Sequence, residues 1–97
     1  MKVTREIVLT EEEKKFIHKC LESKTMLGED DTFSKTANFG NGIEMDIKLC
    51  GSRVDEPWTE AVLFRNGCEL CCSEVSEEFE GEWELEFDGT EYSVTVR

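Results

Sequence analysis

Three short turns constrain the fold of this chain more than any other feature of its sequence. The turns are Gly40-Asn41-Gly42, Asn66-Gly67 and Asp88-Gly89. Glycine, asparagine and aspartate accept the left-handed backbone that tight hairpin turns require, so such pairs are typical of β-hairpins. Each turn is flanked by segments that are β-prone or that alternate apolar and polar residues. The sequence therefore predicts three hairpins over residues 33–96.

The clearest strand pattern lies between the first two turns. Four apolar residues there alternate with four other residues, which is the pattern of a half-buried strand. The apolar set is Ile43, Met45, Ile47 and Leu49, and the alternating set is Glu44, Asp46, Lys48 and Cys50. Further strands are predicted at residues 2–9, at 33–39, from Trp58 to Arg65, from Cys68 to Val75, and on both sides of Asp88-Gly89.

Thr10, followed by three glutamates, predicts the start of a single helix. Thr10 and Glu13 have the spacing of a capping box, and acidic residues favour the positive end of the helix dipole. The apolar stripe that follows at helical spacing is Phe16, Ile17, Cys20 and Leu21. We expect the helix to run to about Lys24, because Gly28 lies beyond its end.

Together these patterns predict an α+β fold, in which one helix packs on a curved antiparallel β-sheet built from hairpins. The chain of 97 residues has the size of a single compact domain, 1–97. Hydrophobic residues make up 38% of it, which is enough to form a core. That core is modest for a chain of this size, so a metal ion would contribute substantially to its stability.

The charge balance restricts the possible partners. Lys and Arg number 11 against 23 Asp and Glu, so the formal net charge is -12. Long-range repulsion then excludes direct binding to nucleic acid or to an anionic membrane, and a macromolecular partner should be basic. The longest apolar run is Ala61-Val62-Leu63-Phe64, too short for a membrane span, and the first residues lack the apolar region of a secretory signal. We expect the reducing cytosol as the compartment.

Five cysteines suggest a metal site rather than disulfides, because the compartment is reducing and their number is odd. Cys68 and Cys71 form a Cys-x-x-Cys pair directly after the Asn66-Gly67 turn, which is the usual half of a structural zinc site. Cys50 is the candidate third ligand, since it ends its strand on the polar face. A closed zinc site of this kind has no open position for catalysis.

The fourth zinc ligand is either Cys72 or His18. Cys72 is nearest in sequence, but adjacent strand residues face opposite ways unless the strand is bulged. His18 lies on the helix, away from the apolar stripe. Cys20 lies on that stripe and is most simply a small buried hydrophobe. The alternative for the whole set is that all five thiols are reduced and partly buried.

An acidic run dominates the C-terminal third of the chain. Ten acids lie between Glu69 and Glu91, and no Lys or Arg occurs from Asn66 to Val96. Strand spacing places Glu82, Glu84 and Glu86 on one face, about 6.6–6.8 Å apart, which is of the same order as successive phosphates. The opposite face holds Trp83, Leu85 and Phe87. The predicted partner-binding set is Glu77, Glu78, Glu80, Glu82, Glu84, Glu86 and Asp88. The alternative is a solvated sheet face in an acidic protein.

The sequence contains no arrangement that is typical of an enzyme. There is one histidine, and no nucleophile elbow, P-loop or dinucleotide fingerprint. A second acidic cluster, Glu29-Asp30-Asp31, lacks the ligand spacing and central glycine of an EF-hand loop. We therefore expect neither catalysis nor calcium binding.

The acidic row from Glu77 to Glu91, the cysteine set and the small size give the chain a resemblance to a known group. It resembles the small phage-encoded anti-CRISPR proteins of type II systems, and looks like a zinc-containing member. The cysteine set is Cys50 and Cys68-x-x-Cys71-Cys72. The resemblance implies binding to the RNA-guided DNA nuclease, whose channels are positively charged, and a block on loading of target DNA.

Two other functions stay open. The first is a nucleic-acid mimic that acts on another basic host protein. The second is a small structural or adaptor zinc protein whose charge serves only solubility. Binding by a mimic should fall steeply with salt, whereas binding by an adaptor should survive salt and depend on an apolar patch.

Overall fold

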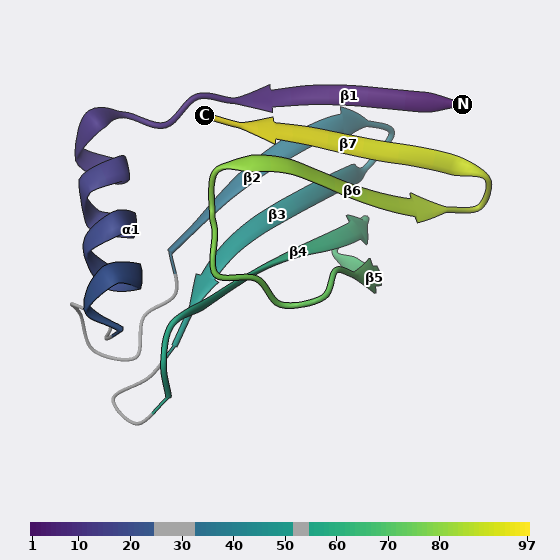
Figure 1. Cartoon of the computed structure of the whole chain (residues 1–97). Coiled ribbons are helices and arrows are strands. Elements are labelled where there is room, and N and C mark those ends of the chain that lie inside the picture. Colours follow the sequence, from purple (N-terminus) through teal and green to yellow (C-terminus); the bar gives the residue numbers. More distant parts are fainter. Residues whose placement is uncertain (25–32, 52–54) are drawn as a thin grey trace.

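A computed structural model describes residues 1–24, 33–51 and 55–97 of the chain. It contains one helix and seven strands, as Figure 1 shows. In chain order these elements are β1 (Lys2–Ile7), α1 (Glu11–Ser23), β2 (Phe33–Gly40), β3 (Ile43–Cys50), β4 (Trp58–Arg65), β5 (Cys68–Cys72), β6 (Gly81–Phe87) and β7 (Thr90–Val96). The α+β class is confirmed.

Local sequence signals account for the helix and its ends. The Thr10 backbone N–H donates to Glu13 Oε1 at 2.9 Å, and the Glu13 N–H donates to Thr10 Oγ1 at 3.1 Å, so the predicted capping box is present. The helix ends at Ser23, and the residue that caps it, Lys24, has a left-handed φ of 56°. Ile17 and Cys20 are fully buried, which confirms the interpretation of Cys20 as a core residue.

All three predicted hairpins form. They join β2 to β3, β4 to β5 and β6 to β7, each pair antiparallel. Asn41, Asn66 and Asp88 have φ values of 53°, 50° and 51°, which is the left-handed backbone that these turns require.

The strands divide between two sheets, which sequence periodicity did not indicate. One sheet has the order β2-β3-β4-β5, and the other has the order β1-β7-β6. β1 leads into the helix and so has no hairpin partner of its own. Instead it pairs in parallel with β7, from Lys2 opposite Glu91 to Ile7 opposite Val96. The result is a mostly antiparallel fold with one parallel pair, formed by the first and last strands of the chain (Figure 1).

The inner faces of the two sheets share one hydrophobic core with the helix. Phe33 on β2 connects them, since its ring lies 5.9 Å from the Phe16 ring on α1 and 5.7 Å from the Phe79 ring before β6. Fully buried core side chains are Ile17, Cys20, Met45, Ile47, Leu49, Ala61, Leu63 and Val94. The sheets also meet at their edges, where Arg5 Nε of β1 donates to the Asn38 carbonyl of β2 at 3.1 Å.

Two predicted strands are shorter than expected. The first ends at Ile7 rather than residue 9, and the strand that begins at Cys68 ends at Cys72 rather than Val75. Gly28 and the acidic cluster Glu29-Asp30-Asp31 lie outside the described residues.

Candidate functional site: an acidic face and an adjoining hollow

The predicted acidic row lies on one face of β6. Glu82, Glu84 and Glu86 are exposed, whereas Trp83 between them is only 9% exposed. Leu85 and Phe87 also pack against the core. The alternation of charged and apolar residues therefore separates the two faces of β6 as predicted.

Neighbouring strands extend this row into a wider surface. Residues opposite each other on paired strands share a face, and Glu86 lies opposite Glu91 on β7, while Glu6 of β1 lies opposite Thr95. We call this surface the acidic face; its carboxylates are Glu6, Glu82, Glu84, Glu86 and Glu91.

Two cations partly neutralise the acidic face. Lys2 Nζ lies 3.2 Å from Glu84 Oε1, and Arg97 Nη2 lies 2.8 Å from Glu6 Oε1. The hydrogen bond and charge of Glu84 raise the pKa of Lys2, and the charges of Glu82 and Glu91 add to this effect. Ser93 Oγ also donates to Glu82 Oε1 at 3.2 Å. Five carboxylates against two cations leave the face negative.

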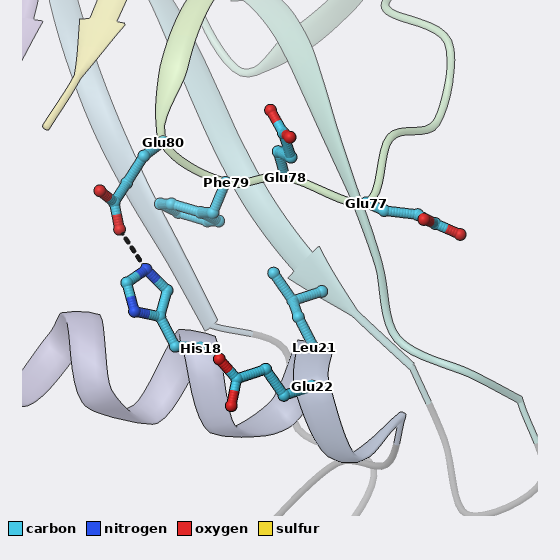
Figure 2. A pocket seen from close by; sticks show the side chains of 7 residues that line it. All are labelled: His18, Leu21, Glu22, Glu77, Glu78, Phe79 and Glu80. Carbon is cyan, nitrogen blue, oxygen red and sulfur yellow. Dashed lines mark hydrogen bonds and ion pairs between the residues drawn. The ribbon is translucent and has the colours of Figure 1, made fainter.

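The remaining predicted acids do not belong to this face. Glu77, Glu78 and Glu80 precede β6 and line a hollow of about 470 Å³ against the helix (Figure 2). We call this hollow the acidic socket; its lining is His18, Leu21, Glu22, Glu77, Glu78, Phe79 and Glu80. Asp88 lies in the turn between β6 and β7. The acids of the row predicted from sequence therefore fall into three groups in the structure: those on β6, those before β6, and Asp88 in the turn.

His18 lines the acidic socket and does not lie beside the cysteines of β5. Its Nε2 lies 2.5 Å from Glu80 Oε1, so it links α1 to the segment before β6 (Figure 2). Sequence reasoning placed His18 on the polar side of the helix but missed both this partner and the contribution of Glu22. The helical pattern shows which side His18 occupies, but not which of many distant acids folds against it.

Cys50 lies apart from the other candidate zinc ligands. Cys72 pairs with Val62, which pairs with Asp46, and Cys50 lies four residues farther along β3. At the usual strand spacings this puts Cys50 and Cys72 roughly 16 Å apart, whereas thiolates on one zinc ion each lie about 2.3 Å from it. Cys50 is buried, and its thiol donates to Glu60 Oε1 at 3.7 Å.

A bulge determines where the thiols of β5 point. Cys71 pairs with Leu63 and Glu69 with Phe64, so Leu70 is the extra residue. Cys68 and Cys71 therefore share the inner face, and the Cys71 thiol donates to the Glu86 carbonyl at 3.8 Å. Cys72 points to the opposite face with Val62. The four predicted ligands are not gathered around one point.

Within residues 1–24, 33–51 and 55–97, no three His, Cys, Asp or Glu side chains form a group able to hold a metal ion. Burial, together with the charge of Glu60, raises the pKa of the Cys50 thiol. Burial and the nearby Cys72 raise the pKa of Cys71. Zinc binding stays a prediction.

The single helix among the described residues does not have the length and apolar character of a membrane-spanning segment.

Comparison with known proteins adds no assignment: no protein-family model, curated protein or solved structure matches this chain.

Proposed function

We propose that the protein is an acidic inhibitor that binds a basic nucleic-acid-handling surface of a CRISPR RNA-guided DNA nuclease. It blocks loading of target DNA and performs no chemistry itself. The observation that carries the proposal is the acidic face, where Glu82, Glu84 and Glu86 project from one side of a strand whose other side is anchored in the core. Nuclease channels that hold nucleic acid are positively charged, so they attract such a face.

The rigidity of β6 supports this role. Trp83 Nε1 donates to the Phe79 carbonyl at 3.0 Å, and this buried bond holds the start of the strand. β6 also pairs with β7 along its whole length, from Gly81 opposite Val96 to Phe87 opposite Thr90. Carboxylates on such a support lose less conformational entropy on binding than those on a flexible tail.

Charge reversal on the acidic face tests the proposal. The variant Glu84→Lys with Glu86→Lys should remain folded, because both side chains are exposed. It should bind guide-loaded nuclease at least about 10-fold more weakly, since attraction to a basic groove becomes repulsion. A pull-down with the nuclease and a DNA-cleavage assay measure the two effects.

The matched control changes the same charge elsewhere. Glu69→Lys with Glu74→Lys alters the net charge equally at two exposed positions outside the acidic face. This control should inhibit almost normally. Equal losses in both variants would indicate a dependence on net charge alone, and normal inhibition by the β6 variant would remove the acidic face from the mechanism. Absence of nuclease binding at low salt would reject the proposal itself.

The acidic face equally suits a nucleic-acid mimic directed at a different basic host protein, and the pull-down identifies the partner. In either case we infer that the protein acts in the bacterial cytosol, where its free cysteines stay reduced.

An adaptor function is a second candidate because of the other sheet. Trp58 and Phe64 lie on its outward face, and both are only half-buried. Binding through these aromatic side chains would persist at high salt, whereas binding through the acidic face would weaken steeply. Affinity measured across a salt series distinguishes the two candidates.

A further inference from the structure

We propose that Cys68 and Cys71 bind one soft, monovalent metal ion of the Cu(I) type between their two thiolates. This inference goes beyond the proposed function and does not depend on it. It concerns β5, which carries three of the five cysteines of the chain. Thiolate ligands select soft ions such as Cu(I), whereas hard ions prefer oxygen ligands.

The bulge at Leu70 brings the two thiols to the same side of β5. Cys68 lies opposite Arg65, and Cys71 lies opposite Leu63. Without the bulge, residues three apart on a strand would face opposite ways. Because Arg65 and Leu63 are two residues apart on β4, the Cα atoms of the two cysteines lie roughly 6.6–6.8 Å apart. The Cys-x-x-Cys pair therefore consists of neighbours on one face of the sheet.

The spacing of this pair suits a bridging ion better than a disulfide. A metal–sulfur bond of about 2.3 Å, the length found for zinc, places two sulfurs on opposite sides of an ion about 4.6 Å apart. A disulfide needs an S–S distance of about 2.0 Å and Cα atoms about 4.4–6.8 Å apart. Side chains on one face of a strand run roughly parallel, so their sulfurs stay nearer to the larger separation. Binding of an ion therefore requires less movement of β5 than disulfide formation does.

The number of ligands near the pair favours two-coordinate binding. Cys72 points to the opposite face with Val62, and Cys50 lies farther away on β3. Among residues 1–24, 33–51 and 55–97, no three His, Cys, Asp or Glu side chains form a group that could hold an ion. Structural zinc almost always has four ligands, so the pair alone is a poor zinc site. Cu(I) is a soft ion that two thiolates satisfy.

A nearby cation matches the charge of such a complex. Two thiolates and one monovalent ion together carry one net negative charge. Arg65 lies directly opposite Cys68, and side chains in such pairs have Cβ atoms about 4.5–5.5 Å apart. Its guanidinium lies 5.6 Å from the centre of the Phe87 ring, and it forms no ion pair among the described residues. The positive charge of Arg65 is therefore free to stabilise the complex.

Apolar side chains lie on the other side of the pair. Leu63, opposite Cys71, is fully buried, and Phe87 packs against the core. The Cys71 thiol donates to the Glu86 carbonyl at 3.8 Å, which directs it towards β6. When the ion binds, both thiols release their protons to solvent, and a metal–sulfur bond replaces this hydrogen bond. Hard ions retain their water and are disfavoured beside apolar groups, whereas a soft ion of low charge is not.

Competition for Cu(I) tests the pair. The reduced protein is titrated without oxygen against Cu(I) held by bicinchoninate, a coloured chelator that reports how much metal the protein withdraws. We expect one Cu(I) per chain, and X-ray absorption should show two sulfur ligands. NMR amide shifts should locate the ion at residues 65, 68–71 and 86–87.

Substitution of single thiols makes the assignment specific. Cys68→Ser and Cys71→Ser should each weaken Cu(I) binding at least about 100-fold, because one of two thiolate ligands is lost. Cys72→Ser is the matched control, since it removes the adjacent thiol, which points to the opposite face. This control should weaken binding no more than about 3-fold. Circular dichroism of each variant separates lost binding from lost folding, and the exposed position of Cys68 makes its substitution the safer of the two.

Three results would each overturn the inference. Equal weakening by Cys72→Ser and Cys71→Ser would show that the face on which a thiol lies does not decide binding. Three or more sulfur ligands in X-ray absorption would exclude a two-coordinate site. Failure of the folded protein to withdraw Cu(I) from bicinchoninate would reject the site itself, whatever the outcome of the nuclease assays.

Discussion

The outward faces of the two sheets differ in which residues lie next to their charged side chains. On the acidic face, Glu86 lies directly opposite Glu91, so like charges face each other across paired strands. On the outward face of the four-stranded sheet, Asp46 and Lys48 have local partners. Asp46 accepts a hydrogen bond from Thr36 Oγ1 at 2.7 Å, and Lys48 Nζ lies 5.7 Å from the centre of the Phe64 ring.

Burial differs between these faces as well. Val62 is only 4% exposed although it points outward with Trp58 and Phe64, whereas the carboxylates of the acidic face are exposed. The four-stranded sheet thus covers part of its outward face with its own side chains. On the acidic face, Glu86 and Glu91 keep the repulsion of two like charges, although the other three carboxylates, Glu6, Glu82 and Glu84, have partners there. A basic partner of the kind proposed would relieve this repulsion.

The largest expected effect concerns the support beneath the acidic face. Trp83→Ala should lower the free energy of unfolding by about 3–5 kcal/mol, because it removes a buried aromatic ring. Trp58→Ala, on the outward face of the other sheet, should cost less than half of that. Urea denaturation of both variants measures the two free energies of unfolding. Equal decreases in the two variants would contradict the expectation that the buried ring beneath the acidic face contributes more than the outward ring of the other sheet.

Thiol reactivity tests the difference in burial between two cysteines of the four-stranded sheet. Cys50 and Cys72 point outward from it, but Cys50 is 7% exposed and its pKa is raised by burial, whereas Cys72 is exposed. A raised pKa lowers the thiolate fraction at neutral pH, so iodoacetamide should modify Cys72 at least about 10-fold faster than Cys50. Mass spectrometry of modified peptides gives the rates, and similar rates would contradict the buried position of Cys50.

The same experiment tests zinc. If zinc protected all four predicted ligands from iodoacetamide, the structure would have to rearrange to form the predicted site. These ligands are Cys50, Cys68, Cys71 and Cys72. From the register we expect no joint protection of Cys50 and the thiols of β5. Metal analysis of protein purified without chelators provides the independent measurement.

The smallest expected effect is a gain in stability. Glu86→Gln removes one charge of the pair with Glu91 and should raise the free energy of unfolding by about 0.2–1 kcal/mol at low salt. The gain should shrink as salt screens the repulsion. Glu69→Gln serves as the control, because Glu69 lies opposite Phe64 rather than another acid. A loss of stability in Glu86→Gln would mean that the acidic face carries no strain.

The sequence by itself determined the elements that depend on neighbouring residues. The hairpin turns follow from left-handed backbone at Asn41, Asn66 and Asp88, and the helix start follows from the Thr10–Glu13 capping box. The separation of β6 into a charged and an apolar side also follows from local periodicity, because successive strand residues face opposite ways.

Only the tertiary structure decided which distant segments meet. The pairing of β1 with β7, the contact of His18 with Glu80 and the separation of Cys50 from Cys72 all join or divide residues far apart in the chain. Local periodicity tells which side of an element a residue occupies, but not which element packs against that side. Strand register and a single bulge at Leu70 set the directions of the thiols of β5, and both result from the packing of the whole core.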